Sequence, residues 1–184
     1  MFIIKKYYYL YIDNTKSINL DLLKKSYKYT IIYRTFFLKE NVKNIISFKK
    51  LCQKKKIKFY IANNLNLAKK CKADGLYLSS YNKKIYHNIN VIGAAHNYKE
   101  VNQKIRQRCK KIILSRLFLT KYKNKNSFYG ILKFNLINLK YKKNLIPLGG
   151  INNKNLLLLN LVKSNGFALL SEIKKKPAIA SRLF

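Results

Sequence analysis

Short apolar runs alternate along the chain with more polar segments. Each run is almost continuously apolar, which is typical of a strand buried on both faces, as in a parallel sheet covered by helices. We therefore predict strands at 7–12, 30–34, 57–62, 75–79, 90–95, 111–115, 145–149 and 167–171.

Between the runs, apolar residues recur at steps of three and four, the spacing of an amphipathic helix. Val42, Ile45, Ile46 and Leu51 show this spacing most clearly. The pattern predicts helices over 18–29, 41–55, 64–72, 98–109, 131–140 and 153–163, with a polar loop after the fourth strand.

Eight such alternations predict an α/β fold, a compact (β/α)8 TIM barrel formed as one domain by residues 1–184. The chain is short against the ~250 residues typical of this fold, so its helices must be brief and its loops tight. A doubly wound open sheet is the alternative. The glycines fit the strand assignment, because they fall at or beside strand ends.

Charge is the most unusual feature of the composition, with 40 Lys+Arg against 6 Asp+Glu and a net charge of +34. Such an excess suggests nucleic acid or an anionic membrane as partner. Lys, Asn, Ile, Tyr and Phe all have AT-rich codons, however, and compositional drift explains the lysines better than it explains the scarcity of acids. The basic residues are also spread along the chain, so we do not expect a nucleic-acid partner.

The cysteines and the apolar segments indicate the compartment. Cys52, Cys71 and Cys109 have no CxxC spacing, which favours reduced thiols over a disulfide framework or zinc site. The first residues lack the order of a signal peptide, and no apolar stretch approaches the ~20 residues of a membrane span. We expect a cytoplasmic protein without membrane contact, and the oligomeric state stays open.

Chemistry in a barrel is found at the C-terminal ends of the strands. Gly149, Gly150 and Ser171 end the last two predicted strands, where barrels often bind phosphate through backbone amides. Arg34 ends the second strand and could clamp a phosphate or carboxylate, or lie on the surface. His96 follows the fifth and is a candidate general base or a cap of the next helix.

Carboxylates are missing from these positions. No acid ends any of strands two to eight, whereas a Mg²⁺ site usually needs one or two carboxylates. We therefore predict no resident metal, and expect Mg²⁺ only if a diphosphate substrate brings it.

The motif order resembles a known family over nearly the whole chain. "YIANNLNLAKKCKADGLYLSS", "IGAAHN", "SRLFLTKYK", "PLGGIN" and "NGFALLSEI" occur in the order and spacing of the thiamine phosphate synthase / TenI family. The resemblance implies a (β/α)8 barrel that joins a pyrimidine diphosphate to a thiazole phosphate, both small phosphorylated substrates. In TenI members it implies aromatisation of the thiazole.

The resemblance carries over one half of the family's site. On the phosphate side it implies Thr120, Gly149, Gly150, Leu170 and Ser171 as phosphate-binding residues, with Arg34 and Lys123 as catalytic residues. Asn63, Ala94 and His96 are its candidates for the pyrimidine side.

Most of the diphosphate-binding residues have changed. The Gln and Lys that flank the family's arginine are Ile32 and Phe36, the Asn-Asp pair is Ala62-Asn63, and the second Mg²⁺ aspartate falls near Tyr81-Asn82. The motif serine is Ala94, and the strand-six histidine of TenI members falls at Arg116.

Three functions follow from these patterns. The first is a thiamine phosphate synthase-like transferase of thiamine biosynthesis with a degenerate active site. The second is a catalytically impaired phosphate-ester binder or regulator of the same pathway, and the third is a nucleic-acid-binding protein.

Overall fold

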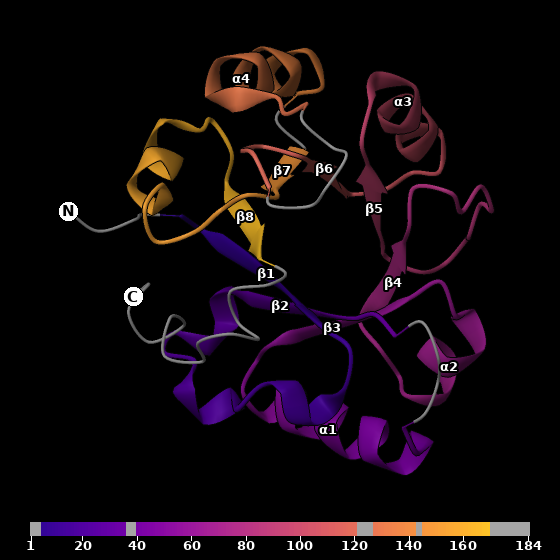
Figure 1. Cartoon of the computed structure of the whole chain (residues 1–184). Helices are drawn as coiled ribbons and strands as arrows, with labels where there is room; N and C mark the ends of the chain where they lie inside the picture. Colours follow the sequence, from indigo (N-terminus) through magenta and orange to yellow (C-terminus); the bar gives the residue numbers. More distant parts are fainter. Residues whose placement is uncertain (1–4, 36–39, 121–126, 143–144, 170–184) are drawn as a thin grey trace.

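Eight parallel strands close into a barrel in chain order, with β8 paired to β1 (Figure 1). The computed structural model describes residues 5–35, 40–120, 127–142 and 145–169. The strands are β1 (Tyr7–Ile12), β2 (Tyr29–Tyr33), β3 (Lys58–Ala62), β4 (Gly75–Leu78), β5 (Val91–Ala95), β6 (Lys111–Ser115), β7 (Leu145–Leu148) and β8 (Gly166–Leu169). The predicted (β/α)8 barrel is confirmed, and the open sheet is wrong.

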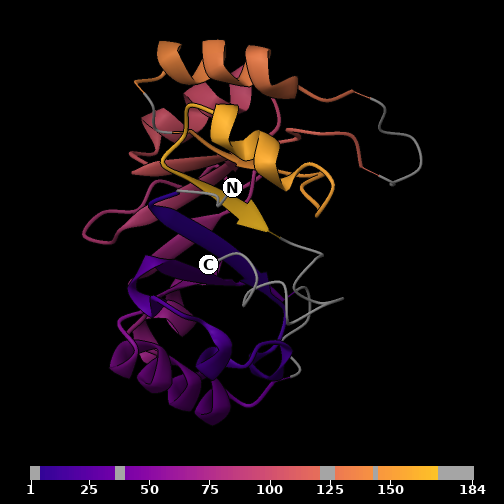
Figure 2. The same ribbon diagram turned by 90° about the vertical axis from the view of Figure 1, so that its left-hand side faces the viewer.

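The described residues form four α-helices, which lie outside the barrel. Helices α1 (Val42–Lys54) and α4 (Gly130–Lys140) lie on opposite sides of it (Figures 1 and 2). Three of the four begin at an asparagine whose side-chain oxygen accepts a hydrogen bond from a backbone N–H of the first turn. No helix within the described ranges is long and apolar enough to cross a bilayer. The helices are α1 (Val42–Lys54), α2 (Leu65–Lys70), α3 (Tyr98–Arg106) and α4 (Gly130–Lys140).

The helix predicted over 18–29 is wrong. The segment instead forms two short 3₁₀ helices, Leu20–Leu22 and Ser26–Lys28, after an earlier one at Thr15–Ser17. Lys25 interrupts it with a φ of +50°, in the left-handed region that stops a right-handed helix.

The helix predicted over 153–163 is also wrong, because only a 3₁₀ helix at Leu156–Leu161 forms there. Asparagine side chains take over local hydrogen bonds that a helix would use. Asn155 Oδ1 accepts from the Asn152 amide at 2.8 Å, and Asn155 Nδ2 donates to the Gly150 carbonyl at 2.7 Å.

Alternate residues of the strands fill the inside of the barrel, and four of the large ones are tyrosines. Tyr9, Tyr11, Tyr60 and Tyr77 are all buried there, together with smaller side chains of the remaining strands. Burial raises the pKa of each of these phenols, so they remain neutral at physiological pH.

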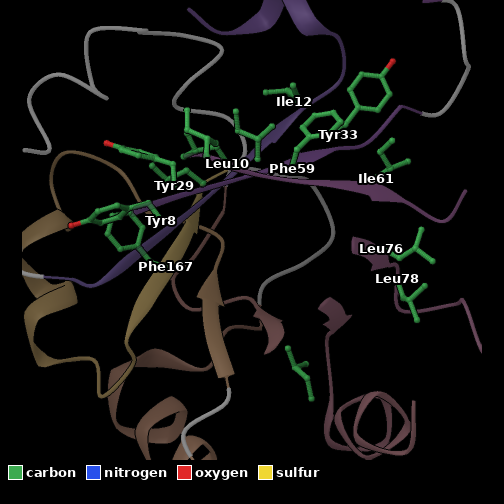
Figure 3. Packing of buried hydrophobic residues seen from close by; sticks show 14 of the residues in the cluster. Tyr8, Leu10, Ile12, Tyr29, Tyr33, Phe59, Ile61, Leu76, Leu78 and Phe167 are labelled. Atoms are coloured by element: carbon green, nitrogen blue, oxygen red, sulfur yellow. The ribbon is translucent and has the colours of Figure 1, made fainter. Parts of the chain in front are cut away.

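The opposite face of each strand packs against the outer layer (Figure 3). Aromatic rings from neighbouring strands meet there. The ring of Tyr8 lies 5.3 Å from the rings of both Tyr29 and Phe167, measured between centroids. Packing between β8, β1 and β2 thus stabilises the seam where the barrel closes.

Asp74, which belongs to the motif "YIANNLNLAKKCKADGLYLSS", fixes the start of β3. Its Oδ2 accepts from Lys49 Nζ at 2.6 Å and from the Phe59 amide at 2.8 Å. Lys49 is buried on α1, so the ion pair ties this helix to the barrel. The motif therefore has a structural role at the end of the barrel opposite the C-terminal ends of the strands.

Candidate functional site

Backbone hydrogen bonds join the loop after β6 to the end of β7 and the loop that follows it. The Leu117 amide donates to the Leu148 carbonyl at 2.9 Å, and the Phe118 amide donates to Gly149 at 3.0 Å. Gly149 and Gly150 have φ values of +99° and +69°, which favour glycine.

Glycine at these positions also allows close approach. A Cβ on Gly149 would lie 2.7 Å from Arg116 Cγ, and one on Gly150 would lie 2.4 Å from the Phe118 carbonyl oxygen. The Gly-Gly turn is thus required for the Arg116 side chain and the β6 loop to lie against it.

Arg116 is the cation of this cluster. Its Nη1 donates to Thr120 Oγ1 at 2.7 Å, which brings a guanidinium, a hydroxyl and a glycine turn together. Arginine is always charged at physiological pH and presents a planar fork of donors, and an anion such as phosphate suits this combination. The predicted phosphate residues Thr120, Gly149 and Gly150 therefore lie together.

Arg34 follows β2, where its backbone amide donates to the Ile12 carbonyl at 2.8 Å. Its charge acts on a buried phenol pair, in which Tyr11 Oη donates to Tyr77 Oη at 3.1 Å. Burial raises the pKa of both phenols, and the Arg34 guanidinium partly opposes that rise. Arg34 thus lies at the mouth, beside the interior tyrosines.

The Asn63 side chain is engaged on both of its polar atoms. Oδ1 accepts from the amide and hydroxyl of Ser79 and from Asn82 Nδ2, each at 3.1 Å. Nδ2 donates to the Tyr81 hydroxyl at 3.2 Å. A neutral amide therefore organises the ends of β3 and β4.

His96 is held by the first turn of α3. Both its backbone amide and its Nδ1 contact Glu100 Oε2, at 2.8 and 3.0 Å. Tyr129 Oη donates to its carbonyl at 2.6 Å. The cap of α3 is the next residue, Asn97, so His96 supports the helix start while its ring stays half exposed. Ala94 points a methyl group into the barrel and offers no hydrogen bond.

These residues do not fit the Mg²⁺ ion that the family resemblance implies. The oxygens at the ends of β3 and β4 belong to neutral groups that are already hydrogen-bonded. The Asn63 amide oxygen accepts from Ser79 and Asn82. The carbonyls of Ser79 and Asn82 accept from Lys104. Across the described ranges, no three His, Cys, Asp or Glu side chains lie close enough to hold a metal.

Three further predicted site residues, Lys123, Leu170 and Ser171, lie outside the described residues.

Comparison with known proteins identifies the family of this chain. Residues 22–173 match the family described as thiamine monophosphate synthase. The chain belongs to this family. No protein with a curated function matches the sequence.

Solved structures show the same fold at low sequence identity. Thiamine phosphate pyrophosphorylase from Pyrococcus furiosus is 16% identical, with a TM-score of 0.70 over 96% of this chain and 94% of that one. The same-named protein from Bacteroides thetaiotaomicron is 16% identical, with a TM-score of 0.59 over 91% and 83%. The 3-keto-L-gulonate-6-phosphate decarboxylase of Vibrio cholerae is 12% identical, with a TM-score of 0.60 over 97% and 96%.

The sequence analysis did not name Arg116 as a site residue, although it lies with Thr120 and Gly149. Its place directly after β6 is a signal that could have identified it, because side chains at strand ends face the mouth of a barrel. The sequence analysis also missed the hydrogen-bonded pair of Tyr11 and Tyr77. In a sequence, a tyrosine in a buried strand cannot be distinguished by pattern from other apolar strand residues.

Proposed function

We propose that this protein of the thiamine monophosphate synthase family joins a hydroxymethylpyrimidine diphosphate to a thiazole phosphate, with release of diphosphate. The observation that carries the proposal is the cluster of Arg116, Thr120 and Gly149. A guanidinium, a hydroxyl and a glycine turn are the groups expected to bind a phosphate monoester. In the proposal, Gly150, Leu170 and Ser171 complete this phosphate site.

The reaction breaks one bond and forms one. The thiazole nitrogen uses its lone pair to bond the pyrimidine methylene carbon, and the electrons of the C–O bond leave with the diphosphate. Negative charge therefore grows on the leaving oxygen, and a fixed positive group stabilises it. Arg34 is proposed to supply that charge, with Lys123 as a second cation, while Asn63, Ala94 and His96 line the pyrimidine side.

A second function competes with the first, namely a phosphate-ester binder that does not turn over. Asn63 favours it, because its side-chain oxygen already accepts three hydrogen bonds from Ser79 and Asn82. Ala94 adds no donor for a diphosphate. In this alternative, the β6–β7 cluster, formed by Arg116, Thr120, Gly149 and Gly150, binds a thiazole phosphate or thiamine phosphate, and the pyrimidine end binds no diphosphate.

The deciding experiment is product formation by the purified protein. Incubation with both phosphorylated precursors and Mg²⁺ should give thiamine phosphate, and an Arg34→Gln variant should slow it severely. Calorimetry should detect the thiazole phosphate in both proteins, since Arg34 is not part of the β6–β7 cluster. Binding of the thiazole phosphate without any product at high protein concentration would refute the enzyme and favour the binder.

Nucleic acid remains the third hypothesis, carried only by the charge of +34. It requires an affinity that falls steeply with salt yet persists near physiological ionic strength. Loss of all nucleic-acid binding by ~150 mM salt would reject it.

A further inference from the structure

A lysine is fully buried between α3 and the segment after β4. Lys104 is 0% exposed, and its Nζ donates to the carbonyls of Ser79 and Asn82 at 2.7 and 2.8 Å and to Gln107 Oε1 at 2.9 Å. An ammonium has three N–H donors, and three oxygens receive them. The group is therefore satisfied although none of these three partners is a carboxylate.

The surrounding chain makes room for this lysine. A Cβ on Gly93 of β5 would lie 2.7 Å from Lys104 Cδ and 2.8 Å from its Cγ, so the glycine lets the aliphatic stem lie on the strand. Gln107 is also buried and extends the cluster, because its Nε2 donates to the Asn82 and Lys84 carbonyls at 3.0 and 2.6 Å.

These hydrogen bonds satisfy backbone carbonyls that a helix would satisfy in other connections of the barrel. No helix forms in residues 79–90, all of which the structure describes, so the carbonyls of this segment need other donors. Lys104 and Gln107 supply donors to the carbonyls of Ser79, Asn82 and Lys84. A buried cation thus replaces helical hydrogen bonds in the β4–β5 connection.

The same segment holds the pyrimidine end of the mouth. Ser79 and Asn82, whose carbonyls bind Lys104, also donate to Asn63 Oδ1. A single chain of contacts therefore runs from α3 through residues 79–84 to the end of β3.

We propose that Lys104 is a positioning residue, which sets the place of Asn63 and of the 79–84 backbone at the pyrimidine end. This inference rests on the proposed function for its substrate, while its geometry does not depend on it. Lys104 itself is buried and does not touch the substrate.

The test compares Lys104→Met with Lys99→Met, which removes a lysine from an exposed position of the same helix. In Lys104→Met, hydrogen exchange of the Ser79 and Lys84 amides should rise at least tenfold, because their acceptors Asn63 and Asn82 lose their fixed place. Exchange of the β1 and β2 amides should stay unchanged. Lys99→Met should behave as wild type.

Ligand binding separates positioning from general stability. Affinity for the pyrimidine diphosphate should fall about tenfold in Lys104→Met, while affinity for the thiazole phosphate stays within twofold. Equal losses for both ligands, or unchanged exchange of residues 79–84, would overturn the proposal. If Lys104→Met does not fold, Gln107→Leu is the second variant to test, and hydrogen exchange of the Lys84 amide should rise in it as well. Wild-type protein that binds no pyrimidine diphosphate would refute the proposed function, and the exchange measurement would still decide whether Lys104 holds the segment.

Discussion

Removing the charge of Arg116 tests most directly whether the β6–β7 cluster binds phosphate. Arg116→Gln keeps a side-chain N–H donor that can face Thr120 but removes the guanidinium. The side chain stays polar and flexible, and the left-handed turn at Gly149 is untouched, so the barrel should fold normally. We expect weaker binding of the thiazole phosphate with little change in the unfolding temperature.

The size of the effect follows from the bond that is lost. A hydrogen bond between charged partners contributes about 1.5–3 kcal/mol. Since each 1.4 kcal/mol is a factor of ten, affinity should fall roughly 10- to 150-fold. The lower half of that range is expected, because Arg116 is partly exposed and water screens its charge.

The assay is calorimetric titration of the purified protein with thiazole phosphate and with inorganic phosphate. Arg106→Gln is the matched control, because it removes the same charge from an exposed position at the end of α3. That variant should lose less than twofold. An Arg116→Gln protein that binds as tightly as the control would refute the phosphate assignment at β6 and β7.

Three further predictions concern stability and reactivity. Gly93→Ala should lower the free energy of unfolding by about 1–3 kcal/mol, because the new Cβ meets the Lys104 stem; denaturant unfolding measures this. Asp74→Asn should lower it by about 2–3 kcal/mol by leaving the buried lysine of α1 uncompensated, whereas Asp21→Asn, at an exposed ion pair, should cost under ~1 kcal/mol. Burial raises the pKa of Cys52 from 9.0 to about 12, so its thiolate fraction at pH 8 is about a thousand times smaller in the folded than in the unfolded protein. Alkylation of Cys52 in the native protein should therefore be slower by at least that factor, and its rate should increase as the pH rises.

The strands were predictable because each is a continuous apolar run between polar segments. Two of the predicted helices do not form, and each has its own physical reason. In residues 18–29 a left-handed Lys25 ends the pattern, and in 153–163 Asn152 and Asn155 bond the local backbone. Spacing of apolar residues reports which face is buried and does not register such side-chain competition.

The site was predictable where it depends on backbone shape and not where it depends on side-chain partners. The Gly-Gly turn after β7 could be predicted from its place in the strand order. The hydrogen bonds of Asn63 could not be predicted, because their partners come from residues 79–82. The burial of Lys104 could not be predicted either, because a lysine on a helix normally lies on the exposed face. The expectation that the glycines fall at or beside strand ends is wrong for Gly93, which is the middle residue of β5. A glycine inside a strand often marks a close approach, so Gly93 was the signal for the buried Lys104.

The distribution of the few acids bears on how the mouth works. Every described carboxylate has a structural partner, in contacts between Asp13 and Ser17, Asp21 and Lys55, Glu40 and Tyr33, Asp74 and Lys49, and Glu100 and His96. Between Glu100 and Glu172 the sequence has none. The β6–β7 cluster thus lies in a stretch of sequence without negative charge, which favours the approach of anions. Compositional drift can supply exposed lysines, but it does not place Arg116 against Gly149 or bury Lys104 among three oxygens.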